Sequence, residues 1–135
     1  TVLWTLGSPG SDYQLPDGST HLFRHQHQFE VRENSILVMD NYGAIDGGSR
    51  AVEYSLDLES AEAIPIWSYE ATPQVSTFAL GDVQHLPAGE TMVTWSTAGQ
   101  IDLISRDDEL IRQINVGIGG TFGYAYWLET LSISP

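Results

Sequence analysis

The chain has 135 residues, 41% of them apolar, and a formal net charge of -13. This length suits one domain with a hydrophobic core, and the absence of cysteine excludes disulfides and thiolate metal sites. Its basic residues are five arginines and no lysine, which argues against nucleic-acid binding, since that affinity comes largely from cations on phosphates. No run approaches the roughly 18 apolar residues of a membrane span.

Short β-rich runs alternate with turn-forming residues along the whole chain, and helical signals are nearly absent. Turns such as RENS (32–35) and PAGE (87–90) suit antiparallel hairpins. The sequence therefore predicts an all-β, antiparallel fold. The predicted strands cover residues 2–6, 27–31, 35–40, 50–57, 64–70, 78–86, 91–96, 100–105, 110–116 and 122–128.

The predicted strands repeat in two similar units. Residues 29–41 align with 84–96, residues 51–57 with 100–106 and, more loosely, residues 64–70 with 109–115. Four strands in about 50 residues are typical of a β-propeller blade. The sequence thus predicts a single domain over residues 1–135, a partial β-propeller with two four-stranded blades at about 27–70 and 78–116.

Both ends of the chain look like strands of neighbouring blades. Residues 2–7 resemble the outer strand of a preceding blade, and residues 121–131 resemble the innermost strand of a following one. An open stack of blades would expose edge strands, and propellers close with four or more blades. We therefore expect the chain to be part of a larger propeller, in which other blades or another chain cover the edges.

Three of the four histidines lie within residues 21–29. On an extended chain His25 and His27 point the same way, which suits a metal or an anion. Their spacing also matches the start of a cupin motif, and residues 81–89 match part of the second cupin motif. Met92, however, stands where the last histidine ligand should be. A metal-binding cupin-like barrel stays an alternative. The missing histidine ligand, however, favours a site without metal.

Several short motifs follow one another in a recognisable order. Together they resemble the bacterial arylsulfotransferase family, whose pattern reads Q-H-x-A, F-D-N-G, S-R-x-V-E-Y and V-W-E-Y. One departure is Phe29, which stands where the family has alanine. The matching segments are QH (26–27), LVMDN (37–41), GSRAVEY (48–54), IWSY (66–69), GDVQHLPAGET (81–91) and WTLG (4–7).

The resemblance implies a six-bladed propeller that transfers a sulfuryl group from a phenolic sulfate ester to a phenol, without a nucleotide donor or other cofactor. It assigns the transient sulfuryl group to His27, and it alone suggests a periplasmic or extracellular location. The chemistry is reasonable, because a neutral imidazole is a good nucleophile. Sulfuryl transfer should also need donors around the equatorial oxygens, as phosphoryl transfer does.

Arg50 is the best local cation for a sulfate oxygen, and its alternative role is a salt bridge to Asp40 or Glu53. The family's other sulfate-binding residues come from blades that precede these, so the activity of the segment alone stays open. A non-catalytic propeller segment that serves as a binding scaffold is a further alternative. The remaining candidates are His25 and Asn41 for substrate binding, and Gln26 and Asp40 as supporting residues.

Overall fold

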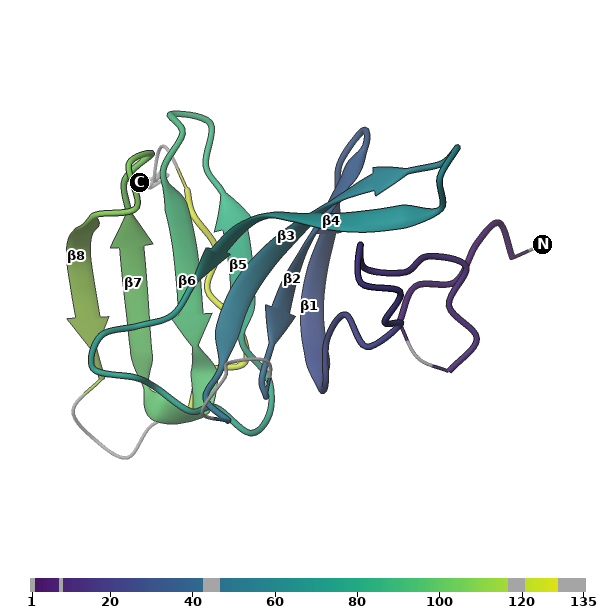
Figure 1. Ribbon diagram of the computed structural model, residues 1–135. Coiled ribbons are helices and arrows are strands. Elements are labelled where there is room, and N and C mark those ends of the chain that lie inside the picture. Colours follow the sequence, from purple (N-terminus) through teal and green to yellow (C-terminus); the bar gives the residue numbers. More distant parts are fainter. Residues whose placement is uncertain (1, 8, 43–46, 117–120, 129–135) are drawn as a thin grey trace.

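The computed structural model describes residues 2–7, 9–42, 47–116 and 121–128, and it holds two four-stranded antiparallel sheets (Figure 1). Each sheet is a meander in which every strand pairs with the next one along the chain. The first sheet contains β1 (Gln26–Val31), β2 (Ser35–Asp40), β3 (Arg50–Asp57) and β4 (Glu62–Tyr69). The second contains β5 (Asp82–His85), β6 (Thr91–Trp95), β7 (Gln100–Ile104) and β8 (Leu110–Asn115), with a short 3₁₀ helix, Ser96–Ala98, between β6 and β7.

This order confirms the predicted all-β fold with blade-like sheets. A meander of four strands is the arrangement of a propeller blade, whereas a cupin has the double-sheet jelly-roll order. The two sheets pack face to face, and the first also packs against the N-terminal segment, drawn in purple in Figure 1. The cupin-like barrel is therefore excluded by the topology of the described strands.

The two sheets differ in the length of their first hairpin. Val31 pairs with Ile36 across the first hairpin, and His85 pairs with Thr91 across the second. The second turn is one residue longer, and Gly89 in it has a φ of 100°, which glycine adopts without steric cost. The sequence alignment of the two repeats is consequently off by one residue in their first strands.

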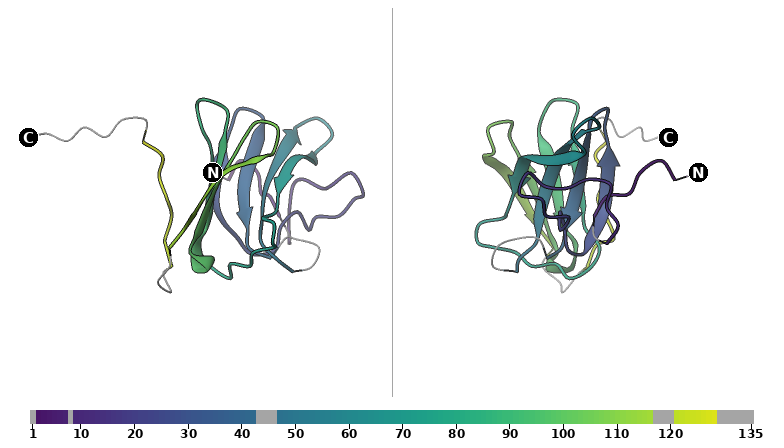
Figure 2. Two further views of the ribbon diagram at one scale, coloured as in Figure 1. Left: turned by 90° about the vertical axis from the view of Figure 1, so that its left-hand side faces the viewer. Right: turned by 45° about the vertical axis from the view of Figure 1, so that its right-hand side comes forward.

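The terminal segments predicted as strands, residues 2–6 and 122–128, are not part of either ladder. Their backbone groups bond to side chains as well as to single backbone groups of nearby loops. Asp12 Oδ2 accepts the N–H of Thr5 at 2.6 Å, and Gln84 Nε2 donates to the carbonyl of Ala125 at 2.7 Å. The second segment, drawn in yellow, runs along the outer side of the second sheet (Figure 2).

The core lies in two layers on either side of the first sheet. Strand β2 is buried on both faces because alternate residues point to opposite sides of a sheet. Leu37 and Met39 face the second sheet, and Ile36 and Val38 face the N-terminal segment. The buried cluster between the sheets consists of Leu37, Met39, Ala51, Ala71, Val83, Val93, Trp95 and Ile104.

A buried carboxylate also ties the two sheets together. Asp102 of β7 is fully buried and accepts hydrogen bonds from Trp95 Nε1 at 2.8 Å and from Gln100 Nε2 at 3.0 Å. It also accepts from Gln113 Nε2 at 3.0 Å and from the Tyr69 hydroxyl of the first sheet at 3.3 Å. These donors satisfy a polar group that would otherwise be costly to bury.

Burial and the neighbouring Asp102 carboxylate raise the pKa of Tyr69 to about 12, above its ordinary value of 10.0. The folded protein thus favours the protonated phenol, and this contribution to stability is complete below pH 10. We expect it to be lost as the pH rises from about 10 to about 12. Urea unfolding should show that the free energy of unfolding of the wild type decreases across this pH range. In Tyr69→Phe the decrease should be smaller by the contribution of Tyr69. The exposed Tyr124→Phe is the control, and an unchanged alkaline profile in Tyr69→Phe would contradict the assignment.

Candidate functional site

His27 lies near the start of β1, at an irregularity in the strand. Gln26 pairs with Asp40 and Phe29 pairs with Val38, so the two residues between them on β1 oppose a single residue of β2. This is a β-bulge, a feature that often redirects a side chain beside an active site. The His27 side chain is exposed there.

The His27 side chain lines a cavity of about 390 Å³ between the first sheet and the N-terminal segment. Its polar lining comes from Thr5, Gln26 and His27. Trp4, on the far wall, packs edge-on against the buried ring of Tyr13 at 5.9 Å between ring centroids. A cavity that is mostly apolar with a few polar groups is the usual form of a small-molecule site. The apolar lining consists of Trp4, Leu6, Phe23, Phe29, Ile36 and Val38.

His25 does not share this cavity with His27. Strand β1 begins at Gln26, after His25, and the His25 ring packs against Tyr42 with 5.3 Å between centroids. The backbone of His25 has a φ of 117°, which residues other than glycine rarely adopt. The two imidazoles are therefore separated, and His27 alone lies at the cavity.

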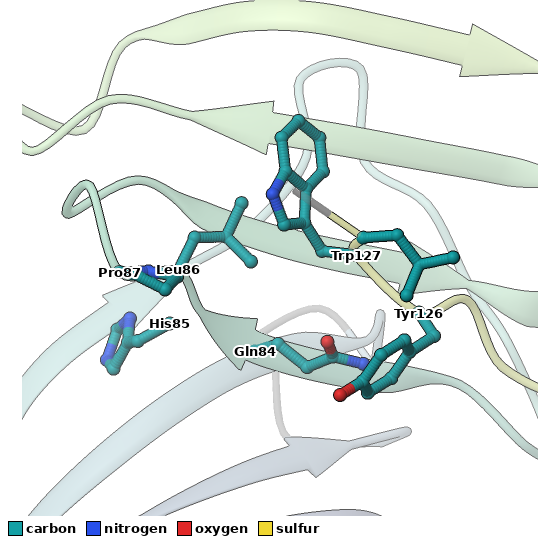
Figure 3. A pocket seen from close by; sticks show the side chains of 7 residues that line it. Gln84, His85, Leu86, Pro87, Tyr126 and Trp127 are labelled. Atoms are coloured by element: carbon teal, nitrogen blue, oxygen red, sulfur yellow. The ribbon is translucent and has the colours of Figure 1, made fainter. Parts of the chain in front are cut away.

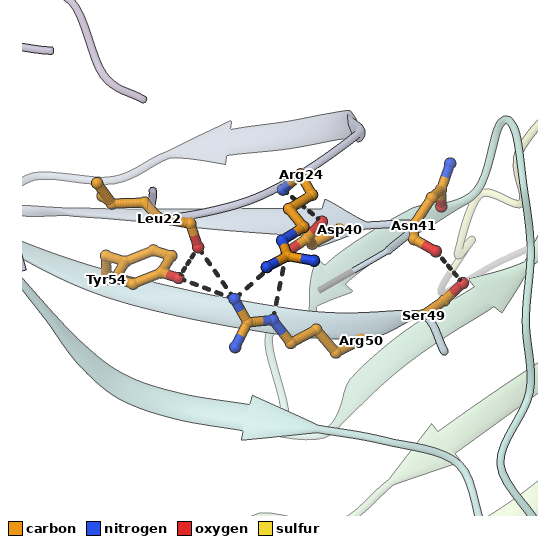
Figure 4. A network of polar contacts seen from close by, with 7 residues as sticks. All are labelled: Leu22, Arg24, Asp40, Asn41, Ser49, Arg50 and Tyr54. Carbon is orange, nitrogen blue, oxygen red and sulfur yellow. Dashed lines mark hydrogen bonds and ion pairs between the residues drawn. The ribbon is translucent and has the colours of Figure 1, made fainter. Parts of the chain in front are cut away.

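Arg50 pairs with Asp40, one of the two salt bridges that the sequence left open (Figure 4). Its Nε and Nη2 atoms both lie 3.3 Å from Oδ2 of Asp40, which is fully buried. Nη2 also donates to the carbonyl of Leu22 at 3.0 Å and to the Tyr54 hydroxyl at 3.2 Å. The guanidinium is thus engaged by protein groups, and it is not part of the cavity lining at His27.

Asp40, Arg50 and Tyr54 together hold the segment that leads into β1. The second oxygen of Asp40, Oδ1, accepts the backbone N–H of Arg24 at 3.0 Å, and the Tyr54 hydroxyl donates to the carbonyl of Leu22. Burial raises the pKa of Tyr54, and the adjacent Arg50 guanidinium partly offsets that rise. Sequence reasoning missed Tyr54, although residues four apart on a strand face the same side and Arg50 was already a candidate.

Asn41 links the end of β2 to the loop before β5 and does not line the cavity. Its side chain is fully buried, and Nδ2 donates to the carbonyl of Leu80 at 3.1 Å. Its backbone carbonyl accepts from Ser49 Oγ at 2.8 Å (Figure 4). Its backbone N–H donates to the carbonyl of His25 at 3.2 Å. In this structure Asn41 therefore packs inside the protein, away from the cavity that His27 lines.

A second cavity, of about 430 Å³, lies beside the C-terminal segment (Figure 3). His85 on its wall has both ring nitrogens occupied, with Nε2 3.0 Å from Glu53 Oε2 and Nδ1 2.7 Å from Thr91 Oγ1. The half-buried His85 thus links the two sheets through Glu53. The lining consists of Gln84, His85, Leu86, Pro87, Tyr126, Trp127 and Leu128.

The described residues contain neither a cluster of metal-ligating side chains nor a membrane-spanning helix. Within residues 2–7, 9–42, 47–116 and 121–128, no three histidine, aspartate or glutamate side chains gather closely enough to hold a metal ion. In the same ranges, no helix has the length and apolarity needed to cross a membrane.

Comparison with known proteins adds one family assignment. The family model described as Arylsulfotransferase (ASST) matches residues 1–117. The match covers most of the chain, including all eight strands and the His27 cavity. Neither the curated proteins nor the solved structures contain a match to the chain.

Proposed function

The chain belongs to the arylsulfotransferase (ASST) family, and we propose that it transfers a sulfuryl group from a phenolic sulfate ester to a phenol through His27. The observation that carries the proposal is the exposed imidazole on the wall of an otherwise largely apolar cavity. An aryl sulfate matches this cavity, because it has an apolar ring joined to an anionic group. The proposal places the ring among the apolar side chains and the sulfur atom at the imidazole.

The reaction then has two displacements at sulfur. In the first, a lone pair on a ring nitrogen of His27 attacks sulfur, an N–S bond forms, and the S–O bond to the aryl group breaks. The phenolate leaves with the electron pair of that bond. In the second, the oxygen of the acceptor phenol attacks sulfur, the N–S bond breaks, and the acceptor proton passes to water or to the first phenolate. Covalent catalysis of this kind replaces one difficult transfer by two easier ones.

Phe29 supplies a ring surface next to His27 in this arrangement. Both side chains line the same cavity, and Phe29 is 62% exposed, so most of its face is free to contact a ligand. Aromatic rings prefer offset stacked or edge-to-face contacts, which add to the burial of apolar area. The phenylalanine that replaces the family's alanine would thus contribute to recognition of the aryl group.

Phe29→Ala is expected to raise KM for an aryl sulfate about 3- to 10-fold and to change kcat less. An aromatic contact contributes about 0.5–1.5 kcal/mol, which corresponds to this range. Steady-state kinetics with 4-nitrophenyl sulfate measure the change. The control is Phe78→Ala, because Phe78 is similarly exposed, at 64%, but does not line the cavity. Equal KM values for Phe29→Ala and wild type would remove Phe29 from the proposed site.

The transferase activity itself is tested by following release of 4-nitrophenolate from 4-nitrophenyl sulfate at several phenol concentrations. The proposal expects release that depends on the protein and on phenol, with the parallel double-reciprocal lines of a ping-pong mechanism. A non-catalytic propeller segment would show no release above the protein-free rate at any phenol concentration, and that result would refute the proposal.

A further inference from the structure

We infer that residues 22–25 form a strained segment, held by Asp40, Arg50 and Tyr54, and that this segment positions His27 for attack on sulfur. The inference rests on the proposed function, because it assigns these residues to the same site. It gives Arg50 and Asp40 a role that acts through the backbone before β1. It also gives His25 a role that depends on its backbone conformation, with no contribution from its imidazole to substrate binding.

The strain lies at His25, two residues before His27. A φ of 117° brings a side chain with a Cβ atom into conflict with its own backbone, and such residues persist only where the surroundings enforce the conformation. They concentrate at functional sites for this reason. The next irregularity along the chain is the bulge that contains His27. The path of the backbone into β1 thus departs from a regular strand at two adjacent places.

Three side chains from β2 and β3 enforce this path from one side. Asp40 and Arg50 are directly paired across the two strands, so the ion pair sits on a hydrogen-bonded ladder. Arg50 Nη2 and the Tyr54 hydroxyl both donate to the carbonyl of Leu22, and Asp40 Oδ1 accepts the N–H of Arg24. Each of these hydrogen bonds thus joins an anchor to the backbone of the segment.

A fourth anchor fixes the residue with the unusual φ. The backbone N–H of Asn41 donates to the carbonyl of His25 at 3.2 Å, which leaves the peptide unit after His25 fixed in direction. None of the three anchoring side chains lines the His27 cavity. Their effect on the reaction must therefore pass through the backbone to His27, and it should appear in kcat, because a small displacement of a nucleophile disturbs attack more than binding.

The decisive comparison is His25→Gly against His25→Ala. Glycine adopts a φ of 117° without steric cost, so His25→Gly should raise the melting temperature by about 2–5 °C. The same change frees the backbone, and kcat should fall about 10-fold while KM stays within 2-fold. His25→Ala keeps the Cβ atom and the strain, so it should keep the wild-type kcat and show none of the rise in melting temperature. If His25→Ala loses as much activity as His25→Gly, the imidazole itself acts, and the inference is overturned.

Tyr54→Phe tests the anchors separately, because it removes one hydroxyl and keeps the buried ring. We expect kcat to fall about 3- to 10-fold at constant KM, since one anchoring hydrogen bond is lost. Hydrogen exchange of the Arg24 amide, which is bonded to Asp40, should be faster in Tyr54→Phe. This exchange rate can be measured whether or not the protein turns over substrate. An inactive wild type would refute the proposed function alone. An Arg24 exchange rate that is the same in Tyr54→Phe and wild type would overturn the inference.

Discussion

His27→Ala is expected to reduce kcat/KM for 4-nitrophenyl sulfate at least about 1,000-fold, with little change in the free energy of unfolding. Loss of a covalent nucleophile removes the pathway itself, so the residual rate reflects only binding and positioning. The fold should tolerate the change because the His27 side chain is exposed at a bulge. The measurement is steady-state release of 4-nitrophenolate, accompanied by thermal unfolding of the same preparations.

The control for this change is His21→Ala, which removes an exposed histidine outside the strands. We expect it to keep the wild-type rate. A His27→Ala variant that retains more than a tenth of the activity would place the nucleophile elsewhere, and equal losses in both variants would point to a general effect of histidine loss.

Asp102→Ala is expected to lower the free energy of unfolding by about 3–5 kcal/mol. The change leaves the fully buried Trp95 indole N–H and the nearby amide donors without their acceptor, and each unsatisfied buried group costs about 1–3 kcal/mol. It also removes the contact with Tyr69 that joins the two sheets. Urea unfolding near neutral pH measures the difference in the free energy of unfolding between Asp102→Ala and wild type.

The matched control is Asp107→Ala, because Asp107 lies exposed in the turn between β7 and β8. A surface substitution of this kind usually changes stability by less than about 0.5 kcal/mol. If Asp102→Ala is as mild as Asp107→Ala, the carboxylate does not hold the sheets together in the way that its four donors indicate.

The sequence predicted the strands well where local pattern determines them. The β-rich runs at β2, β3 and β6 are flanked by turns, and the structure has them at nearly the same bounds. Residues 2–6 and 122–128 have a similar pattern but form no ladder, because a ladder also needs a second strand aligned beside the first. The partner is a long-range property that local pattern does not contain.

In the candidate site, too, local motifs were readable from the sequence and long-range features were not. The motif around Gln26 and His27 indicated the candidate nucleophile, and the S-R-x-V-E-Y motif indicated Arg50, whose partner the structure identifies as Asp40. The positive φ of His25 and the bulge at His27 leave no mark in composition or periodicity, since a single backbone angle and one extra residue in a strand depend on the contacts around them. The cavity wall Trp4 comes from the N-terminal segment, which lies far from β1 in the sequence, and it could not be placed beside His27 beforehand.

The most direct test of the sulfohistidine proposal is to trap the covalent intermediate. The protein is incubated with 4-nitrophenyl sulfate in the absence of a phenol acceptor, quenched at alkaline pH and digested with trypsin. Cleavage after Arg24 and Arg32 releases residues 25–32, which contain both His25 and His27. Fragment masses are expected to show one added SO₃ group on His27, lost when phenol is supplied. An SO₃ group on His25, or no modified peptide in a preparation that releases nitrophenolate, would contradict the proposal.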